Sequence, residues 1–318
     1  MKSVAILGSG QLGSGVARIL RARGTVDVHG PYDRESRSFA LESGADVVVI
    51  ATTTRLSEVA DDIATAVKHR SNVLVSAEEA ANPRAIDPEI AERIDLLAVK
   101  HGVSVAGVGI NPGLLYDALV LTLLGATADG AEISVFRTVD LAKFGPTVLR
   151  RIGIGLTPDD FAAGVAAGRV LGHAGFPQSM TLVAEAIGIT VRRIDKSLIP
   201  VIASESVVSA SGLHIAAGES RGITQVYTAL TAEGSWFKAS FRGEVRSAAD
   251  PLVTADVIEL RSANELISRV TVEPGIDAQA GSQNMIANSV DRIVLSRPGW
   301  RTVAELVPAF PSAATQKF

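Results

Sequence analysis

A glycine-rich turn near the amino end has the residue types and spacing that bind a dinucleotide. The run Gly8-Ser9-Gly10-Gln11-Leu12-Gly13 lies between an apolar segment, 2–7, and a helix-like segment, 12–22. The first glycine permits a tight turn, the second lets the backbone approach a pyrophosphate, and the third lets helix and strand pack closely. Free N–H groups at the helix start then face the phosphates. Although GxGxxG alone is a weak signal, its place between strand and helix favours a dinucleotide site over a glycine-rich turn without a ligand.

An acidic residue is expected about 20 positions after such a turn, where it accepts from the ribose 2′-hydroxyl. Asp33 stands there, in the run Tyr32-Asp33-Arg34-Glu35-Ser36-Arg37. Asp33 favours NAD, whereas Arg34, Ser36 and Arg37 carry donors that suit a 2′-phosphate. We therefore expect the chain to bind both NAD and NADP, with Ala51 and Thr52, where the next strand ends, also at the cofactor.

Two adjacent carboxylates, Glu78 and Glu79, directly follow the strand-like segment 72–76. Ligands of open α/β sheets bind outside the carboxyl ends of the strands. A carboxylate there is placed for acid/base chemistry beside a dinucleotide, and burial would raise its pKa toward the working range. Two solvated acids in the first turn of a helix would have the same spacing. Since side chains alternate along extended backbone, we expect only one of the pair to face the substrate, and we prefer Glu79.

Further candidates lie downstream. Gly107-Val108-Gly109-Ile110-Asn111-Pro112-Gly113 is a second strand–turn–helix pattern, compatible with a ligand contact and with an interdomain hinge. Arg137 and Asp140 flank a strand end, where they either line a pocket or form a surface ion pair. His173 follows a helix in a glycine turn, as a pocket residue or a helix cap. The five histidines have no ligand spacing, so the sequence predicts no metal site.

The elements around these residues alternate between buried strands and amphipathic helices, which predicts a parallel, doubly wound sheet. The strands expected in it are 2–7, 25–29, 46–51, 72–76 and 103–108, and the helices are 12–22, 56–69 and 88–101. A helix over 114–124 and a strand over 132–140 follow, then a helix over 158–171. The later strands, 189–198, 212–217, 223–232, 236–245 and 266–272, are antiparallel in character, and 278–296 is helical. The predicted division is a dinucleotide-binding domain, 1–112, an α+β substrate and oligomerisation domain, 113–276, and a C-terminal helix returning to the first domain with a tail, 277–318.

Composition narrows the function classes. The chain has 318 residues, a net charge of −4 and 4% aromatic residues, without a basic block, which argues against nucleic-acid binding. It has no cysteine, which excludes disulfides and cysteine nucleophiles and is compatible with a reducing cytoplasm. No signal peptide or membrane span is expected. The apolar, β-rich stretch 223–245 needs cover, so we expect a homodimer.

Several segments together carry a family resemblance. They are Gly8–Gly13, Glu78-Glu79, Gly107–Gly113 followed by Asp117, 137–140, 153–161, 172–179, and the tail Asn288 … Arg297-Pro298-Gly299-Trp300 with Thr302. Together they resemble 2,4-diaminopentanoate dehydrogenases and the related native amine dehydrogenases, whose fold is like dihydrodipicolinate reductase. The resemblance extends over nearly the whole chain, and its middle and C-terminal motifs are more specific than the glycine turn.

The resemblance implies NAD(P)-dependent oxidative deamination of an amine, reversible as reductive amination of a ketone or aldehyde with ammonia. It implies a catalytic glutamate at Glu78 or Glu79, and Asn111, Pro112 and Gly113 beside the nicotinamide. The substrate pocket it implies comprises Arg137, Asp140, Phe144, His173 and Ser282, the last standing where relatives have threonine.

The chain also departs from the family. The region after Asp33 is shorter than in relatives, which leaves the cofactor preference open. The paired histidines, lysine and PSGTA-like run of true dihydrodipicolinate reductases are missing, which argues against that substrate. The rival expectations are a reductase of the same fold for another imine or carbonyl, and a dinucleotide-binding protein without catalysis.

Overall fold

The computed structural model describes residues 1–127, 131–142, 144–246, 252–263, 265–306 and 308–311. The chain forms two compact units. The first comprises Met1–Leu121, Gln178–Gly188 and Asp277–Phe318, and the second comprises Thr122–Pro177 and Ile189–Ile276. Residues 113–121 and 178–188 therefore belong to the first unit, whereas the sequence prediction assigned them to the second. The end of the expected C-terminal tail, residues 312–318, lies outside the described residues.

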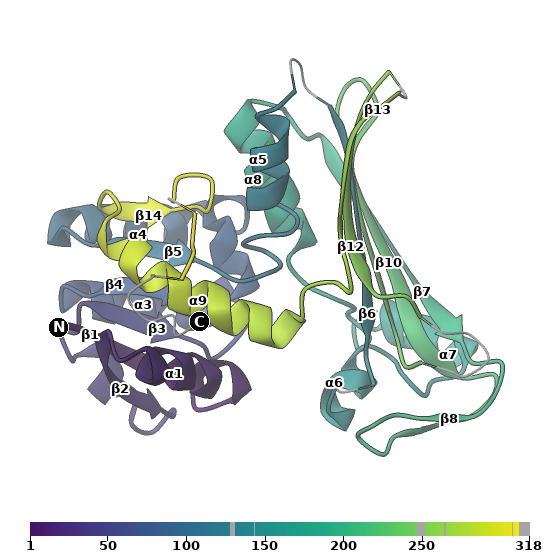
Figure 1. The fold of residues 1–318 in the computed structure, drawn as a ribbon, viewed down its shortest axis with the longest axis horizontal. Coiled ribbons are helices and arrows are strands. Elements are labelled where there is room, and N and C mark those ends of the chain that lie inside the picture. Colours follow the sequence, from purple (N-terminus) through teal and green to yellow (C-terminus); the bar gives the residue numbers. More distant parts are fainter. Residues whose placement is uncertain (128–130, 143, 247–251, 264, 307, 312–318) are drawn as a thin grey trace. The chain divides into compact units, whose positions relative to one another are not determined.

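The first unit contains a six-stranded parallel sheet with the order β14-β5-β4-β3-β1-β2 (Figure 1). Its strands are β1 (Lys2–Leu7), β2 (Val26–Tyr32), β3 (Val47–Ile50), β4 (Asn72–Val75), β5 (Ser104–Gly107) and β14 (Gly299–Arg301). All four residues of β3 are fully buried, as expected for a central parallel strand covered on both faces.

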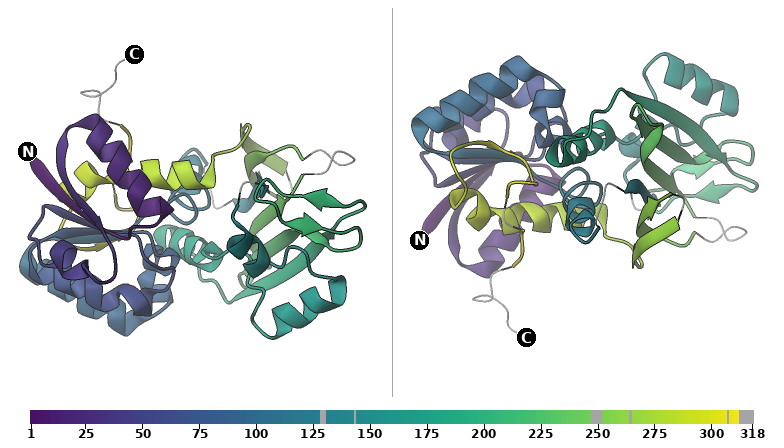
Figure 2. Two further views of the ribbon diagram at one scale, coloured as in Figure 1. Left: turned by 90° about the horizontal axis from the view of Figure 1, so that it is seen from below. Right: turned by 90° about the horizontal axis from the view of Figure 1, so that it is seen from above.

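Helices cover both faces of this sheet. They are α1 (Gln11–Arg23), α2 (Arg37–Leu41), α3 (Leu56–Lys68), α4 (Pro88–His101) and α9 (Ala278–Val294). Side chains of α1 and α9 share one buried cluster with alternate residues of β1 and β3, while those of α3 and α4 share another with the opposite residues. In Figure 2 the purple α1 and the yellow-green α9 accordingly lie on one side of the sheet and the blue helices on the other. The arrangement is doubly wound.

Two further helices of this unit are α5 (Ala118–Leu124), which runs into the second unit, and α8 (Phe176–Ile187), which begins there. Two 3-10 turns, η1 (Glu78–Ala81) and η2 (Pro83–Ala85), follow β4. The sequence predicted one helix over 114–124, but residues 111–117 form turns, and α8 and β14 were not predicted.

The second unit is an α+β domain with a six-stranded sheet in the order β13-β12-β6-β11-β10-β7. Its strands are β6 (Glu132–Asp140), β7 (Arg193–Ile202), β10 (Ser220–Leu230), β11 (Ser235–Glu244), β12 (Ala255–Ser262) and β13 (Glu265–Val272). Only β6 and β11 pair in parallel among these strands, so the sheet is mostly antiparallel. The unit also contains α6 (Pro146–Arg151), α7 (Pro158–Ala166) and a small pair, β8 (Val207–Val208) with β9 (His214–Ile215).

Within the part of the chain that the structure describes, no helix combines the length and apolarity needed to cross a membrane.

Candidate functional site

The glycine turn after β1 fits a pyrophosphate. Gly8 has a φ of +120°, and a Cβ there would lie 2.3 Å from the carbonyl oxygen of Ala51. A Cβ on Gly13 would lie 1.9 Å from the carbonyl oxygen of Gly8, so helix and turn pack too closely for any side chain. A Cβ on Gly10, in contrast, would meet nothing within 4 Å. The packing of the turn therefore requires glycine at positions 8 and 13. Glycine at position 10 instead leaves open space in front of the N–H groups of α1, where a pyrophosphate would bind.

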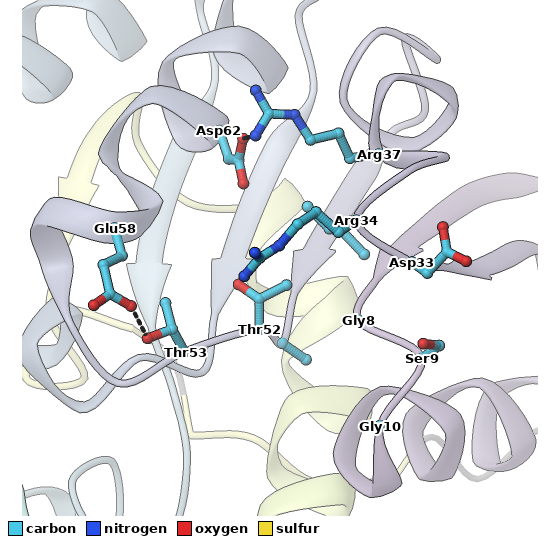
Figure 3. Close-up of a pocket in the computed structure, with 12 residues that line it drawn as sticks. Gly8, Ser9, Gly10, Asp33, Arg34, Arg37, Thr52, Thr53, Glu58 and Asp62 are labelled. Atoms are coloured by element: carbon cyan, nitrogen blue, oxygen red, sulfur yellow. Dashed lines mark hydrogen bonds and ion pairs between the residues drawn. The ribbon is translucent and has the colours of Figure 1, made fainter.

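A pocket of about 610 Å³ opens beside this turn (Figure 3). Its lining comes from the ends of β1, β2 and β3, from the start of α2 and from α3: Leu7, Gly8, Ser9, Gly10, Asp33, Arg34, Arg37, Ala51, Thr52, Thr53, Glu58 and Asp62. The pocket thus unites the predicted cofactor residues Gly8, Gly10, Asp33, Arg34, Ala51 and Thr52. Its size and position suit the adenosine half of a dinucleotide. Thr53, Glu58 and Asp62 were missed because nothing in the sequence marks which residues of the loop after β3 and of α3 face this end of the sheet.

Charged groups of both signs line this pocket. One Asp33 carboxylate oxygen accepts from Ser36 Oγ at 2.6 Å and Ser36 N at 2.9 Å, and these bonds lower the pKa of Asp33. Ser36 therefore holds the turn and is not among the lining residues. The Arg37 guanidinium lies 3.6 Å from Asp62, and Arg34 extends toward Thr52 (Figure 3). Burial raises the pKa of Asp62, which Arg37 opposes.

A second, smaller cavity of about 110 Å³ lies further along the carboxyl ends of the strands. It is lined by Leu12, Ser76, Ala77, Glu78, Ala81, Val108, Gly109, Ile110, Asn111, Pro112, Ser282 and Ile286. The Asn111 side chain is the notable member, because its amide oxygen and nitrogen are both buried and neither has a hydrogen-bond partner among the described residues. A buried amide with a free donor and a free acceptor could form hydrogen bonds to the carboxamide of a nicotinamide ring.

The two adjacent glutamates do different things. An Oε atom of Glu79 accepts a hydrogen bond from the backbone N–H of Leu56 at 2.8 Å, which caps the start of α3. Glu78 lines the cavity with Asn111 and Ser282. The two residues begin a 3-10 turn in which successive side chains point about 120° apart. We preferred Glu79 as the substrate-facing residue on the assumption that the backbone here is extended. Because the backbone forms a 3-10 turn, that argument no longer applies.

In the second unit, Arg137 and His173 occupy one polar cluster. Arg137 is buried, with its guanidinium 3.1 Å from an Asp256 carboxylate oxygen and 2.6 Å from the Ile276 carbonyl oxygen. His173 is fixed through its backbone, which donates to the side chain of Gln225 at 2.7 Å and accepts from it at 3.0 Å. Burial lowers the pKa of His173 to about 4, and the charge of Arg137 acts in the same direction. The imidazole is therefore neutral near pH 7.

Aromatic rings surround this histidine within the same unit. The rings of Phe176 and Phe241 lie 5.3 and 5.1 Å from the His173 ring, and Phe176 stacks on Tyr227 at 5.2 Å. The rings of Phe176, Tyr227 and Phe241 are themselves buried, so this cluster fixes the surroundings of His173.

The other predicted pocket residues have different surroundings. Asp140 forms an ion pair with Arg246 at 2.8 Å and accepts a hydrogen bond from the Ala142 N–H. Of the two predictions for Asp140, a pocket residue or an ion pair, these contacts fit the ion pair. Phe144 packs against a separate apolar cluster that includes Leu141 and Leu149. Ser282 lies on α9 in the first unit, at the smaller cavity. The described residues contain no cluster of three potential metal ligands.

Comparison with known proteins assigns the chain to a family. The family model for the 2,4-diaminopentanoate dehydrogenase C-terminal domain matches residues 114–318. The chain is also 30% identical to 2,4-diaminopentanoate dehydrogenase of Acetoanaerobium sticklandii, over 95% of its own length and 92% of that protein. The chain belongs to the 2,4-diaminopentanoate dehydrogenase family. This membership confirms the family resemblance and makes the chain an oxidoreductase that uses a nicotinamide dinucleotide.

Solved structures confirm the fold of this family member. The amine dehydrogenase of Mycobacterium smegmatis matches with a TM-score of 0.80 and 20% identity, over 98% of this chain and 97% of that one. The DAP dehydrogenase of C. glutamicum matches with a TM-score of 0.50 and 13% identity, over 96% and 94%. The predicted fold class, a Rossmann domain with a second α+β domain of the dihydrodipicolinate reductase-like type, is confirmed.

Proposed function

We propose that this family member is an NAD(P)-dependent amine dehydrogenase with Glu78 as its acid/base. It oxidises a primary amine and water with NAD(P)⁺ to a carbonyl compound, ammonium and NAD(P)H, and it runs in reverse as reductive amination. The observation that carries the proposal is Glu78 at the smaller cavity with Asn111 and Ser282, beyond a glycine turn that leaves room for a pyrophosphate. Family membership supplies the class of reaction.

The cofactor, when bound, supplies the hydride acceptor or donor, and the chain's residues do the rest. The N–H groups of α1 would bind the pyrophosphate, and the Asn111 amide would hold the carboxamide of the nicotinamide. Glu78 takes the proton from the substrate ammonium, so that the amine nitrogen can push electrons as its carbon is oxidised. After releasing that first proton to solvent, the Glu78 carboxylate removes a proton from the water that adds to the iminium carbon. It then gives this proton to the nitrogen, which departs as the carbonyl forms and leaves as ammonium with the hydroxyl proton.

The finer cofactor proposal is that both NAD and NADP bind. Asp33 keeps a second carboxylate oxygen for a ribose hydroxyl, and Arg34 lies in the same pocket as a donor for a 2′-phosphate. Dissociation constants that differ by more than about 1000-fold, about 4 kcal/mol, would contradict dual use.

The decisive experiment is a screen of amines with NAD and with NADP, followed by NADH and NADPH oxidation with ketones in the presence and absence of ammonia. A carbonyl substrate reduced only with ammonia supports the proposal. Reduction without ammonia favours the rival reductase of another imine or carbonyl. Cofactor binding without turnover of any amine or carbonyl favours the rival without catalysis.

For assembly we propose a homodimer through the sheet of the second unit. Val226, Ser240, Phe136 and Val257 are register neighbours on one face of four strands, and each is at most partly buried within the chain. A second copy would cover this row. A monomeric mass by light scattering at micromolar concentration would refute the dimer. We also propose a cytoplasmic location, with which a cysteine-free chain is compatible and which cell fractionation tests.

A further inference from the structure

Asp117 is a carboxylate buried completely within the first unit. One of its oxygens accepts from the Gly113 N–H and from Ser179 Oγ, both at 2.8 Å, and the other accepts from the Ala118 N–H at 2.7 Å. None of the ion pairs found among the described residues involves it. Burying a carboxylate without a cationic partner costs free energy of folding. The three donors that converge on Asp117 offset part of this cost and indicate that the carboxylate holds the surrounding backbone in place.

The bond to Gly113 fixes the turn that carries Asn111. Gly113 has a φ of +127°, and a Cβ there would lie 2.4 Å from the backbone of Gly109, so the turn is tightly folded on itself. The Asn111 side chain has no hydrogen-bond partner among the described residues. Its position therefore depends on its backbone, which the Asp117 carboxylate holds two residues away.

Helix α8 braces both walls of the smaller cavity. On one wall Ser179 donates to Asp117, which holds the Asn111 turn. On the other wall Asn82, the residue after η1, donates through Nδ2 to Thr181 Oγ1 at 3.1 Å. Since η1 carries Glu78, the same helix supports the two segments that carry Glu78 and Asn111, which both line the cavity.

We propose that Asp117, braced by Ser179, is a positioning residue for the nicotinamide half of the cofactor: it holds the Asn111 amide where it meets the carboxamide. The inference rests on the proposed function for the place of the nicotinamide. It assigns Asp117 no contact with cofactor or substrate. Asparagine would weaken this arrangement, because its single oxygen carries no full charge and its NH₂ group would face at least one of the three donors that now meet carboxylate oxygens.

The test compares two ligands that differ by the nicotinamide half. NADH and ADP-ribose are titrated calorimetrically against the parent protein, Asp117→Asn and Ser179→Ala. We expect Asp117→Asn to weaken NADH about tenfold or more, the loss typical of a hydrogen bond to a charged group, and to leave ADP-ribose within about twofold. Ser179→Ala removes one of three donors and should act in the same direction, by about threefold. The control Asp46→Asn should change neither ligand, because Asp46 binds Ser3 N and Oγ at the amino end of the sheet.

A double-mutant cycle with Asn111→Ala separates positioning from general stability. If Asp117 acts through Asn111, Asp117→Asn should add little to the loss of NADH affinity already caused by Asn111→Ala. Additive losses, equal weakening of NADH and ADP-ribose, or unchanged NADH binding would each overturn the inference. If Asp117→Asn does not fold, Ser179→Ala with the same cycle decides. A parent protein that binds NADH but oxidises no amine refutes the proposed function, while the binding ratios still decide the role of Asp117.

Discussion

The two neighbouring glutamates give the sharpest prediction, because the structure places them in different environments. Glu78→Gln removes a carboxylate at the smaller cavity, and Glu79→Gln removes one that caps α3. Each Gln substitution keeps the side-chain size and one oxygen that can accept a hydrogen bond, and it removes the negative charge. The two variants therefore differ only in which charge is lost.

The expected magnitudes follow from these contacts. Loss of a general acid/base costs about 100- to 10,000-fold in rate, so Glu78→Gln should lower kcat by at least about 100-fold. The amide oxygen of Glu79→Gln can still accept from Leu56 N, and only the charge at the helix start is lost. That loss is about 0.3–1 kcal/mol of stability, and its effect on kcat should stay within about twofold. Glu79→Ala removes the cap altogether and should cost about 1 kcal/mol, a fall of about 2–4 °C in Tm.

Steady-state oxidation of the best amine found, with calorimetric NADH titration and thermal unfolding, separates these outcomes. NADH affinity should be nearly unchanged in both Gln variants, because the carboxylate acts on the substrate. A large loss of kcat in Glu79→Gln together with normal turnover in Glu78→Gln would refute the assignment made here. Normal turnover in both would move the search for the acid/base to Asp140 and His173.

Three other predictions concern the cofactor and the response to pH. Gly10→Val should abolish binding of NAD and NADP in fluorescence titration, because its side chain would fill the open space before α1; retained binding of either would contradict the pyrophosphate site. Asp62→Asn should tighten NADP by about twofold to fivefold and leave NAD unchanged. The substitution removes a partly exposed ion pair that restrains Arg37 and a charge that opposes a 2′-phosphate; equal shifts for the two cofactors would refute it. His173 has a folded-state pKa of about 4 against an ordinary 6.5, so its contribution to stability is complete above about pH 6.5 and is lost as pH falls toward 4, by up to about 3 kcal/mol. His173→Gln should flatten that part of the pH dependence in urea unfolding, and an unchanged slope would contradict the buried neutral imidazole.

The sequence predicted the first unit well because its signals are local. The apolar run of β3 and the helical spacing of the apolar residues Leu56, Val59, Ile63 and Val67 in α3 are local patterns. Both elements therefore lie within two residues of the predicted bounds. The predicted helix over 114–124 was too long at its start. The Asp117 carboxylate accepts from the Gly113 N–H and so holds residues 113–117 in a turn, and α5 begins only at Ala118.

The sequence did not predict β12, because its strand pattern depends on residues far away in the chain. β12 carries the buried charges Asp256 and Glu259, which pair with Arg137, Arg261 and Arg269 from this and other strands, so it lacks an apolar pattern. The choice between Glu78 and Glu79 depended on a 3-10 turn and on an acceptor for Leu56 N, and neither is encoded in the spacing of two adjacent acids.

The path of the chain has a consequence for synthesis. The chain passes from one unit to the other four times, after Leu121, Pro177, Gly188 and Ile276. Until the ribosome has made α9 and β14, α1 lacks its packing partner and β5 is an open sheet edge. The nascent Rossmann unit therefore remains incomplete through most of translation, and a C-terminal truncation before α9 would expose Val16 and Leu20 to chaperones and proteases instead of yielding a smaller folded protein.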